Sequence, residues 1–210
     1  MNEHLFITLY SQITVSMARK IDEDKIARIK EAIMQTIVEN GIEATTIAMI
    51  AKKAKVSGGY LYRTYAGKQD LINELYHDKV NSLYEELEVL LTLNPKSVQP
   101  LIETFIKNRI GYFLNEPNAS KFFYQLLHNE NFFASEIIKE KSAELMKSIK
   151  KIGVKSGEIS KDTTVYQLHY HILVYVVDYI NFTRRNIFGE QEVTLHDVDK
   201  LTRNILSILK

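Results

Sequence analysis

The sequence predicts an all-α protein. Only three prolines and eight glycines occur in 210 residues, and the long segments between them are rich in Ile, Leu, Lys and Glu. Apolar residues recur in these segments at helical spacing. With 45% hydrophobic and 25% charged residues, the chain suits one or two folded domains with a substantial core. Cysteine is absent, which excludes disulfides and is compatible with the cytoplasmic location that we expect.

The N-terminal stretch MNEHLFITLYSQITVSM lacks the features of a secretory signal. It has no basic n-region, and Ser11 and Gln12 break its apolar run. We expect residues 1–16 to be an extension, either a misassigned start or a flexible arm, upstream of a domain that begins near Met17. The uncharged apolar run YHILVYVV (170–177) has eight residues, far fewer than the roughly 20 of a membrane span, so no membrane contact is predicted.

A first helix is expected from about Asp24. Asp22 or Asp24 can cap its start, and Gly41 can end it. Its buried face should consist of residues at helical spacing, namely Ile26, Ile29, Ile33 and Ile37.

A second, short helix should begin after Thr45 or Thr46 as its N-cap. Its apolar or small residues fall on one stripe: Ile47, Ile50, Ala51 and Ala54. Lys55 makes the following turn, where Gly would be less strained if the position requires φ > 0.

The third helix has Ser57 as a natural N-cap and Leu61 as its inward residue. At 100° per residue the outward face then carries Gly59, Tyr60, Tyr62 and Arg63. Two short helices joined by a turn, the second one decorated in this way, form the helix-turn-helix pattern.

Positive charge is concentrated around this pattern. No Asp or Glu occurs between Ala44 and Gln69, and residues 17–70 carry ten basic and seven acidic side chains, net +3, in a chain of net charge +1. A local basic patch suggests a polyanionic partner, although a solvated charge run is the commoner meaning of such a cluster.

These features together predict a DNA-binding surface. An outward Gly allows close approach, Tyr hydroxyls and backbone amides can donate to phosphate, and the helix is slim enough for a major groove. The alternative is a surface connector whose tyrosines only pack on neighbours. The candidate DNA-binding residues are Thr45, Thr46, Ser57, Gly58, Gly59, Tyr60, Tyr62, Arg63, Thr64 and Lys68.

The remainder of the chain also reads as helical. A long helix starts at Lys68, and its apolar side contains Leu71, Leu75, Leu83, Leu87 and Leu90. LNPKSVQP (93–100) breaks the chain. Further helices are predicted at about 98–114, 119–133, 135–157, 163–185 and 195–209.

Nearly every position from Ile172 to Phe182 is apolar or aromatic. This favours a helix that is buried both against the core of its own subunit and against a second subunit; an ordinary core helix is the alternative.

The stretch TTIAMIAKKAKVSGGYLYRTYAGKQDLI resembles the DNA-binding signature of the TetR family of transcriptional regulators. The resemblance covers about 50 residues and is carried by Thr46, Ile50, Ala51, Ala54, Val56, Ser57, Gly59, Leu61, Tyr62, Tyr65, Lys68 and Leu71. Three positions depart from the family pattern: Lys55 stands where Gly is usual, Gly58 where a longer polar residue is common, and Thr64 where His or an aromatic is frequent.

The resemblance implies a DNA-binding domain at 17–67 and an effector-binding and dimerisation domain at 68–210. It implies a homodimer, held by the last two long helices, that binds a near-palindromic double-stranded DNA operator. It further implies a repressor that a small-molecule effector releases from this operator. The alternative that we keep is a DNA-binding helical protein without an effector.

An effector pocket in the second domain is likewise implied by the resemblance. Its candidate residues are aromatic or polar: Phe105, Asn108, Tyr112, Tyr124, Gln125, His128, His171, Tyr175 and Asp178. Asp178 is the one acid between Ile172 and Phe182. It could therefore bind a cationic group of the ligand, or pair with Arg184, Arg185 or the other subunit.

Enzymatic activity is not predicted. His169 and His171 are two positions apart, so on a helix they diverge by about 200° and cannot share a metal ion. The sequence contains no HExxH, no GxSxG and no phosphate-binding Gly-rich loop after a strand. No cofactor and no metal site are expected.

Overall fold

The computed structural model describes the backbone of residues 3–187 and 189–210 and the side chains of residues 23–187 and 189–210. These parts of the chain form helices and turns and contain no strand, which confirms the all-α class. The chain divides into two compact units, Met1–Ile72 and Asn73–Lys210. The division predicted between residues 67 and 68 falls at the start of a helix, whereas the units meet a few residues further along that same helix.

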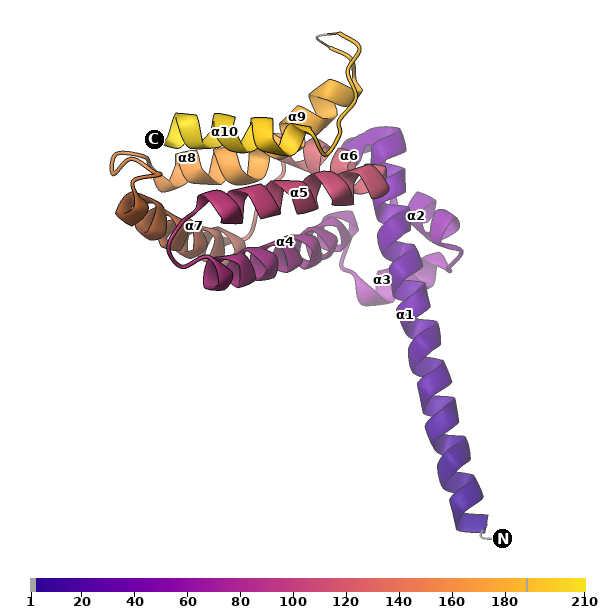
Figure 1. Ribbon diagram of the computed structural model, residues 1–210. Helices are drawn as coiled ribbons and strands as arrows, with labels where there is room; N and C mark the ends of the chain where they lie inside the picture. Colours follow the sequence, from indigo (N-terminus) through magenta and orange to yellow (C-terminus); the bar gives the residue numbers. More distant parts are fainter. Residues whose placement is uncertain (1–2, 188) are drawn as a thin grey trace. The chain divides into compact units, whose positions relative to one another are not determined.

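The first unit contains three helices: α1 (Glu3–Ala44), α2 (Ile47–Ala54) and α3 (Gly58–Thr64) (Figure 1). The backbone of α1 leaves helical geometry at Gly41, with φ 80° and ψ 163°, so Gly41 is the stop that the sequence predicts. The predicted start near Asp24 is wrong, because the helix runs on from Glu3. The side chains of residues 1–22 lie outside those described, and the nature of residues 1–16 stays a prediction.

The core of the first unit lies where α2 packs against α1. Ile29, Ile33 and Ile37 are 3%, 2% and 0% exposed, whereas Ile26 is 43% exposed, so the predicted stripe is one residue too long. The residues predicted for the buried stripe of α2 are all buried: Ile47, Ile50, Ala51 and Ala54.

The turn between α2 and α3 has the left-handed conformation that the sequence raised as a possibility. Lys55 has φ 56° and ψ 44°, and the N–H of Val56 donates to the carbonyl of Ala51 at 3.0 Å. This geometry lets the chain reverse within a few residues, so that α3 can begin at once behind its cap.

The second unit is a bundle of helices that begins within α4 (Lys68–Leu93). The other helices follow in chain order: α5 (Gln99–Asn115), α6 (Pro117–Leu127), α7 (Glu136–Ser156), α8 (Val165–His169), the π-helical turn η1 (Tyr170–Val174), α9 (Tyr175–Arg184) and α10 (Asp197–Leu209). Helix α5 packs against α6, α9 and α10, α7 packs against α8, and α6 against α9 (Figure 1).

Two of the helices predicted for the second unit differ from the observed ones. The helix predicted to run to residue 133 ends at Leu127, because the side chain of Asn129 accepts the N–H of Asn131 at 2.9 Å and stabilises a turn there. The single helix predicted at 163–185 is interrupted by the π-helical turn η1.

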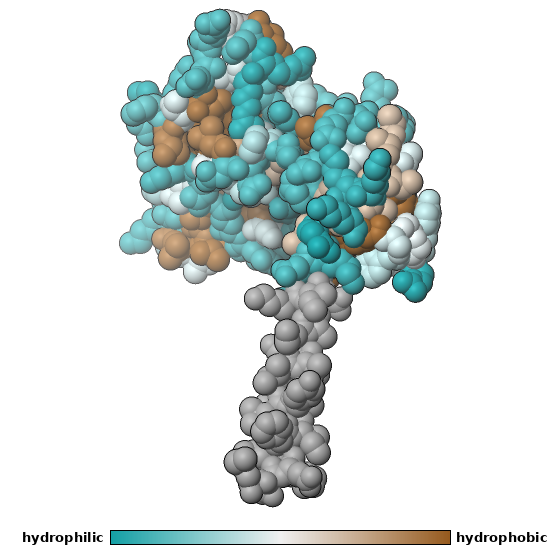
Figure 2. Space-filling model, turned by 90° about the vertical axis from the view of Figure 1, so that its right-hand side faces the viewer, coloured by the Kyte–Doolittle hydropathy of each residue, from teal (hydrophilic) through white to brown (hydrophobic). Residues whose placement is uncertain are grey.

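The surface of the described residues is mostly polar. On the face drawn in Figure 2, apolar side chains appear as separate patches among polar ones, as is normal for a folded protein. No helix in the described part of the chain is at once long enough and apolar enough to cross a membrane.

The end of α7 requires a glycine at position 153. A Cβ added to Gly153 would lie 2.3 Å from Cδ1 and 2.9 Å from Cβ of Ile159, while the N–H groups of Glu158 and Ile159 both donate to the Gly153 carbonyl. We expect Gly153→Ala to destabilise the protein by about 1–3 kcal/mol, as overpacking does. In α5, Gly111 has no atom within 4 Å of an added Cβ, so Gly111→Ala should stabilise it by about 0.5–1 kcal/mol. Urea unfolding checks both values, and changes of the same sign in both variants would contradict this account.

Candidate DNA-binding surface and ligand cavities

Helix α3 presents one inward and one outward face in the first unit. Leu61 is fully buried, whereas Gly59, Tyr62, Arg63 and Thr64 are exposed. Nothing lies within 4 Å of a Cβ added to either Gly58 or Gly59, so a partner can approach this backbone closely. The outward orientation predicted for Gly59, Tyr62 and Arg63 is confirmed, and Thr64, which was not placed on the outward face, is exposed as well.

Tyr60 is less exposed than predicted. It is half-buried, and Nζ of Lys25 lies 4.7 Å from its ring centroid, a distance that allows a cation–π contact. This contact links the third position of α3 to α1 and limits the freedom of the ring. The predicted role of Tyr60 in base contact stays a prediction.

Thr46 and Ser57 hold the starts of α2 and α3. The hydroxyl of Thr46 accepts the N–H of Met49 at 3.2 Å, and that of Ser57 accepts the N–H of Tyr60 at 3.2 Å. Thr46 is therefore the N-cap that the sequence left undecided between two threonines. Both capping residues are exposed on their helix ends and can approach a phosphate.

Thr45 was predicted to contact DNA, but the structure places it in the interior. Its side chain is buried, and its hydroxyl donates to the carbonyl of Gly41 at 2.7 Å. Thr45 thus supplies a hydrogen-bond donor to a carbonyl group near the end of α1 and does not face outward. A threonine pair at a helix start cannot reveal from sequence which hydroxyl turns inward.

Lys68 has a structural role that the sequence did not reveal. Its Nζ donates to the carbonyls of Ile42 and Glu43, at 2.9 and 3.0 Å. The first residue of α4 thereby satisfies carbonyl groups at the end of α1, which a helix leaves without partners. Two of the three Lys68 donors are engaged, so its predicted phosphate contact has less support.

The remaining basic residues of the surface differ in how they are neutralised. Nζ of Lys53 lies 2.6 Å from Oε1 of Glu39 and is thus paired. No carboxylate among the described residues forms an ion pair with Lys52, Lys55 or Arg63. Arg63 is the one of these three that lies on α3, so it carries unbalanced positive charge on the outward face.

The second unit contains a cavity of about 300 Å³. Most of its wall is apolar and comes from α4, α5, α6 and the η1–α9 segment: Tyr76, Val80, Leu83, Tyr84, Phe113, Phe123, Leu127, Leu173, Val174, Val176 and Val177. We call this space the α4–α9 cavity. Its size is at the lower end of the range for small-molecule sites.

Charged and polar residues gather at one part of the wall of the α4–α9 cavity. Arg109 forms an ion pair with Glu86, and Nζ of Lys79 donates to the Tyr112 hydroxyl at 3.0 Å. Both cations also lie over the Tyr112 ring, at 5.5 and 5.4 Å from its centroid. Two positive charges against one carboxylate leave this group at net +1, which favours an anionic group on a ligand.

His169 contributes a further polar group to the cavity wall. Its Nδ1 lies 2.6 Å from the hydroxyl of Ser142, and burial lowers the pKa of its imidazole. Burial also raises the pKa of the Tyr84 hydroxyl, which interacts with the same Ser142. A neutral His169 held by Ser142 gives the apolar wall one polar position.

The second unit holds another cavity, of about 330 Å³, on a different face of α9. Its wall includes Tyr175 and Asp178, and it shares no residue with the α4–α9 cavity. We call it the aromatic cavity, because aromatic side chains form much of its wall, together with small and polar ones: Tyr170, Tyr175, Asp178, Tyr179, Phe182, Thr183, Gly189 and Gln191.

The predicted effector residues are therefore distributed over several places. Tyr112 lines the α4–α9 cavity, whereas Tyr175 and Asp178 line the aromatic cavity. His171 lines neither of them. The other candidates contact neighbouring side chains or lie in the core outside both walls: Phe105, Asn108, Tyr124, Gln125 and His128. Whether any of them binds an effector stays a prediction.

Sequence reasoning missed the charged residues of the α4–α9 cavity. Lys79, Glu86 and Arg109 read as ordinary surface positions, since such side chains are almost never fully buried unless paired. Lys79 and Glu86 lie on α4, and Arg109 and Tyr112 lie on α5. Their positions indicate a shared cluster only once the two helices are known to lie side by side.

Comparison with known proteins agrees with this geometry. Residues 29–75 match the family model described as bacterial regulatory proteins, tetR family. A fatty acid metabolism regulator protein of Bacillus subtilis is 31% identical over 64 residues, which are 30% of this chain and 33% of that relative. The match thus spans about a third of the relative's length.

Solved structures resemble the chain over most of its length. A TetR family transcription regulator from Marinobacter aquaeolei has a TM-score of 0.71 at 16% identity, covering 90% of this chain and 97% of its own. The FadR regulator of Bacillus subtilis in complex with stearoyl-CoA has a TM-score of 0.63 at 20% identity, covering 88% and 97%. At these identities the likeness shows the shared fold, a helix-turn-helix head with a helical body.

The lowered pKa of His169 predicts a loss of stability in mild acid. As the pH falls below about 6.5, the ordinary value for His, the unfolded chain binds a proton at this residue before the folded chain does, and the free energy of unfolding decreases. His169→Gln should reduce the loss between pH 7.5 and 5.5, whereas His196→Gln, at an exposed position, should not. Urea unfolding at both pH values measures this, and an unchanged loss in His169→Gln would contradict the assignment.

Proposed function

We propose that the protein is a ligand-responsive transcriptional regulator whose DNA-binding domain is formed by residues 29–75, the part of the chain that matches the model of bacterial regulatory proteins of the tetR family. In this proposal it acts as a repressor, and a small-molecule effector releases it from a near-palindromic operator. The observation that carries the proposal is the outward face of α3, with open space at Gly58 and Gly59 and unbalanced charge at Arg63.

Helix α3 acts as the recognition helix in this proposal. The first turn of α3 enters the major groove, while Arg63 in its last turn and the capped starts of α2 and α3 approach the phosphates on either side. Tyr62 and Arg63 supply hydrogen-bond donors without a nearby acid: the side chain of Asp70, the next acidic residue along the chain, accepts the N–H of Ala66 at 3.1 Å.

A homodimer would place two such helices on the two halves of the operator. The predicted interface is the helical segment after Thr164 together with α10. Ile172, Val176 and Ile180 are fully buried within the second unit, so the core of the same subunit explains why these residues are apolar. Exposed apolar side chains remain on the outer side, including Tyr166 and Ile208, and these support a second subunit packing there.

The effector that suits the α4–α9 cavity has an apolar chain and an anionic group. The wall is mostly aliphatic and aromatic, and its polar part carries a net positive charge at Lys79, Arg109 and Glu86. The Bacillus subtilis FadR of similar fold was crystallised with stearoyl-CoA, whose acyl chain and phosphates combine the same two features. We infer a fatty-acyl compound as the effector class.

Helix α4 would transmit the effect of the ligand. It contributes Tyr76, Lys79, Val80 and other residues to the cavity, and its first residue, Lys68, bonds to the end of α1. If α4 can adopt two orientations, an effector that binds one of them more tightly shifts the equilibrium toward that orientation. This shift changes the spacing of the two heads in the dimer.

Arg63→Ala tests the DNA interface. Losing one phosphate contact should lower the slope of log affinity against log salt by about one, for all sequences alike. Lys53→Ala is the matched control, since Glu39 already neutralises this lysine. Titration of the wild type and both variants with duplex DNA at several salt concentrations gives the slopes. An unchanged slope in Arg63→Ala would exclude it as a phosphate contact.

Lys79→Met tests the effector site. Dodecanoate should bind the wild type and weaken its binding to DNA, and Lys79→Met should bind dodecanoate about tenfold less tightly, because a charge-assisted hydrogen bond is worth about 1.5–3 kcal/mol. Binding of 1-dodecanol should be the same in both. Lys107→Met, at an exposed position of α5, is the control. If neither probe bound the wild type, the alternative of a DNA-binding protein without such an effector would be favoured.

A further inference from the structure

The aromatic cavity contains a carboxylate in an unusual setting. The side chain of Asp178 is 14% exposed, and no hydrogen-bond donor in the described part of the chain bonds its buried Oδ1. The imidazole of His128 lies beside it, with its Nε2 3.4 Å from that oxygen. Burial raises the pKa of Asp178, and His128 opposes this effect.

Arg184 and Arg185, which follow Asp178 at the end of α9, do not pair with its carboxylate. Arg184 donates to the carbonyl of Phe113, and no ion pair joins Asp178 to Arg184 or Arg185 among the described residues. A partly buried carboxylate whose buried oxygen accepts no hydrogen bond costs free energy, so the fold retains a group that a bound cation would stabilise.

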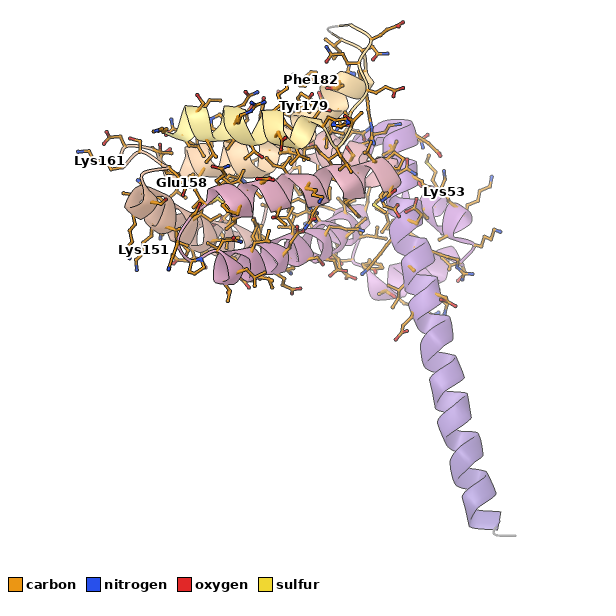
Figure 3. All side chains as sticks on the ribbon, in the orientation of Figure 1. Lys53, Lys151, Glu158, Lys161, Tyr179 and Phe182 are labelled. Atoms are coloured by element: carbon orange, nitrogen blue, oxygen red, sulfur yellow. The ribbon has the colours of Figure 1, made fainter. Side chains whose placement is uncertain are left out.

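The other walls of the aromatic cavity suit an organic cation. Tyr170, Tyr175, Tyr179 and Phe182 surround the space with Asp178, and Figure 3 labels Tyr179 and Phe182 on α9. The Tyr179 hydroxyl donates to Asp197 at 2.6 Å, which holds its ring in place. The wall contains neither lysine nor arginine, so an anion finds no partner there.

We propose that the aromatic cavity binds a small organic cation, a quaternary or substituted ammonium group held by the carboxylate of Asp178 and by the faces of the surrounding rings. Ammonium groups are attracted both to carboxylates and to the faces of aromatic rings. A metal ion is a poorer occupant, because Asp178 is the one carboxylate of the wall and hard cations need several oxygen ligands. This site is separate from the α4–α9 cavity and does not depend on the function proposed for the latter.

Choline and its uncharged isostere 3,3-dimethylbutan-1-ol test the proposal with the full-length protein. Isothermal titration should show choline binding at least tenfold more tightly than the isostere. Asp178→Asn should reduce choline affinity at least tenfold, while Asp162→Asn, an exposed acid outside the wall, should leave it unchanged. Lys79→Met should also leave choline affinity unchanged, which separates this site from the effector cavity.

Three results would overturn the proposal: no choline binding by the wild type, equal binding of the isostere, or an unchanged affinity in Asp178→Asn. Absent choline binding together with weaker dimerisation of Asp178→Asn would show that a second copy of the chain supplies the partner of Asp178. If circular dichroism showed that Asp178→Asn does not fold, Tyr175→Leu would replace it. That variant removes one ring face and should likewise weaken choline binding, and an unchanged affinity would reject the site.

Discussion

The π-helical turn at Tyr170–Val174 decides what the last long helical segment of the protein presents to each side. Within it the N–H of Tyr175 bonds to the carbonyl of Tyr170, five residues back. The turn therefore holds one residue more than an α-helical turn, and every later side chain is rotated relative to a regular helix. As a result Val176 and Val177 face the α4–α9 cavity, while Tyr175 and Asp178 face the aromatic cavity.

The features that could be predicted from the sequence are the local ones. Caps and stops depend on a few neighbouring residues, so Ser57 and Gly41 were foreseen where the structure has them. The inward and outward residues of α3 follow from a regular period of 100° per residue over one short helix. Helices α2 and α3 were largely predictable for this reason, whereas the inward turn of Thr45 and the bonds of Lys68 to the end of α1 were not.

The cavities could not be predicted because they depend on how helices pack and on an irregular backbone. His171, Tyr175 and Asp178 share a face on a regular helix, but His171 lies in the π-helical turn and lines neither cavity. Glu86 and Arg109 lie 23 residues apart in sequence and pair across two helices. No local pattern distinguishes such a pair from solvated surface charges.

Lys55 has a left-handed backbone conformation and also carries an exposed positive charge. A side chain in the left-handed region costs about 1–2 kcal/mol relative to glycine, and the strain falls on the turn that orients the candidate recognition helix. Glycine there would relieve the backbone but remove an exposed positive charge from the stretch between Ala44 and Gln69, which contains no acidic residue. The head thus exchanges some thermodynamic stability for long-range electrostatic attraction, which acts before contact and raises the rate of encounter with a polyanion. That attraction weakens with ionic strength, whereas the strain in the turn does not.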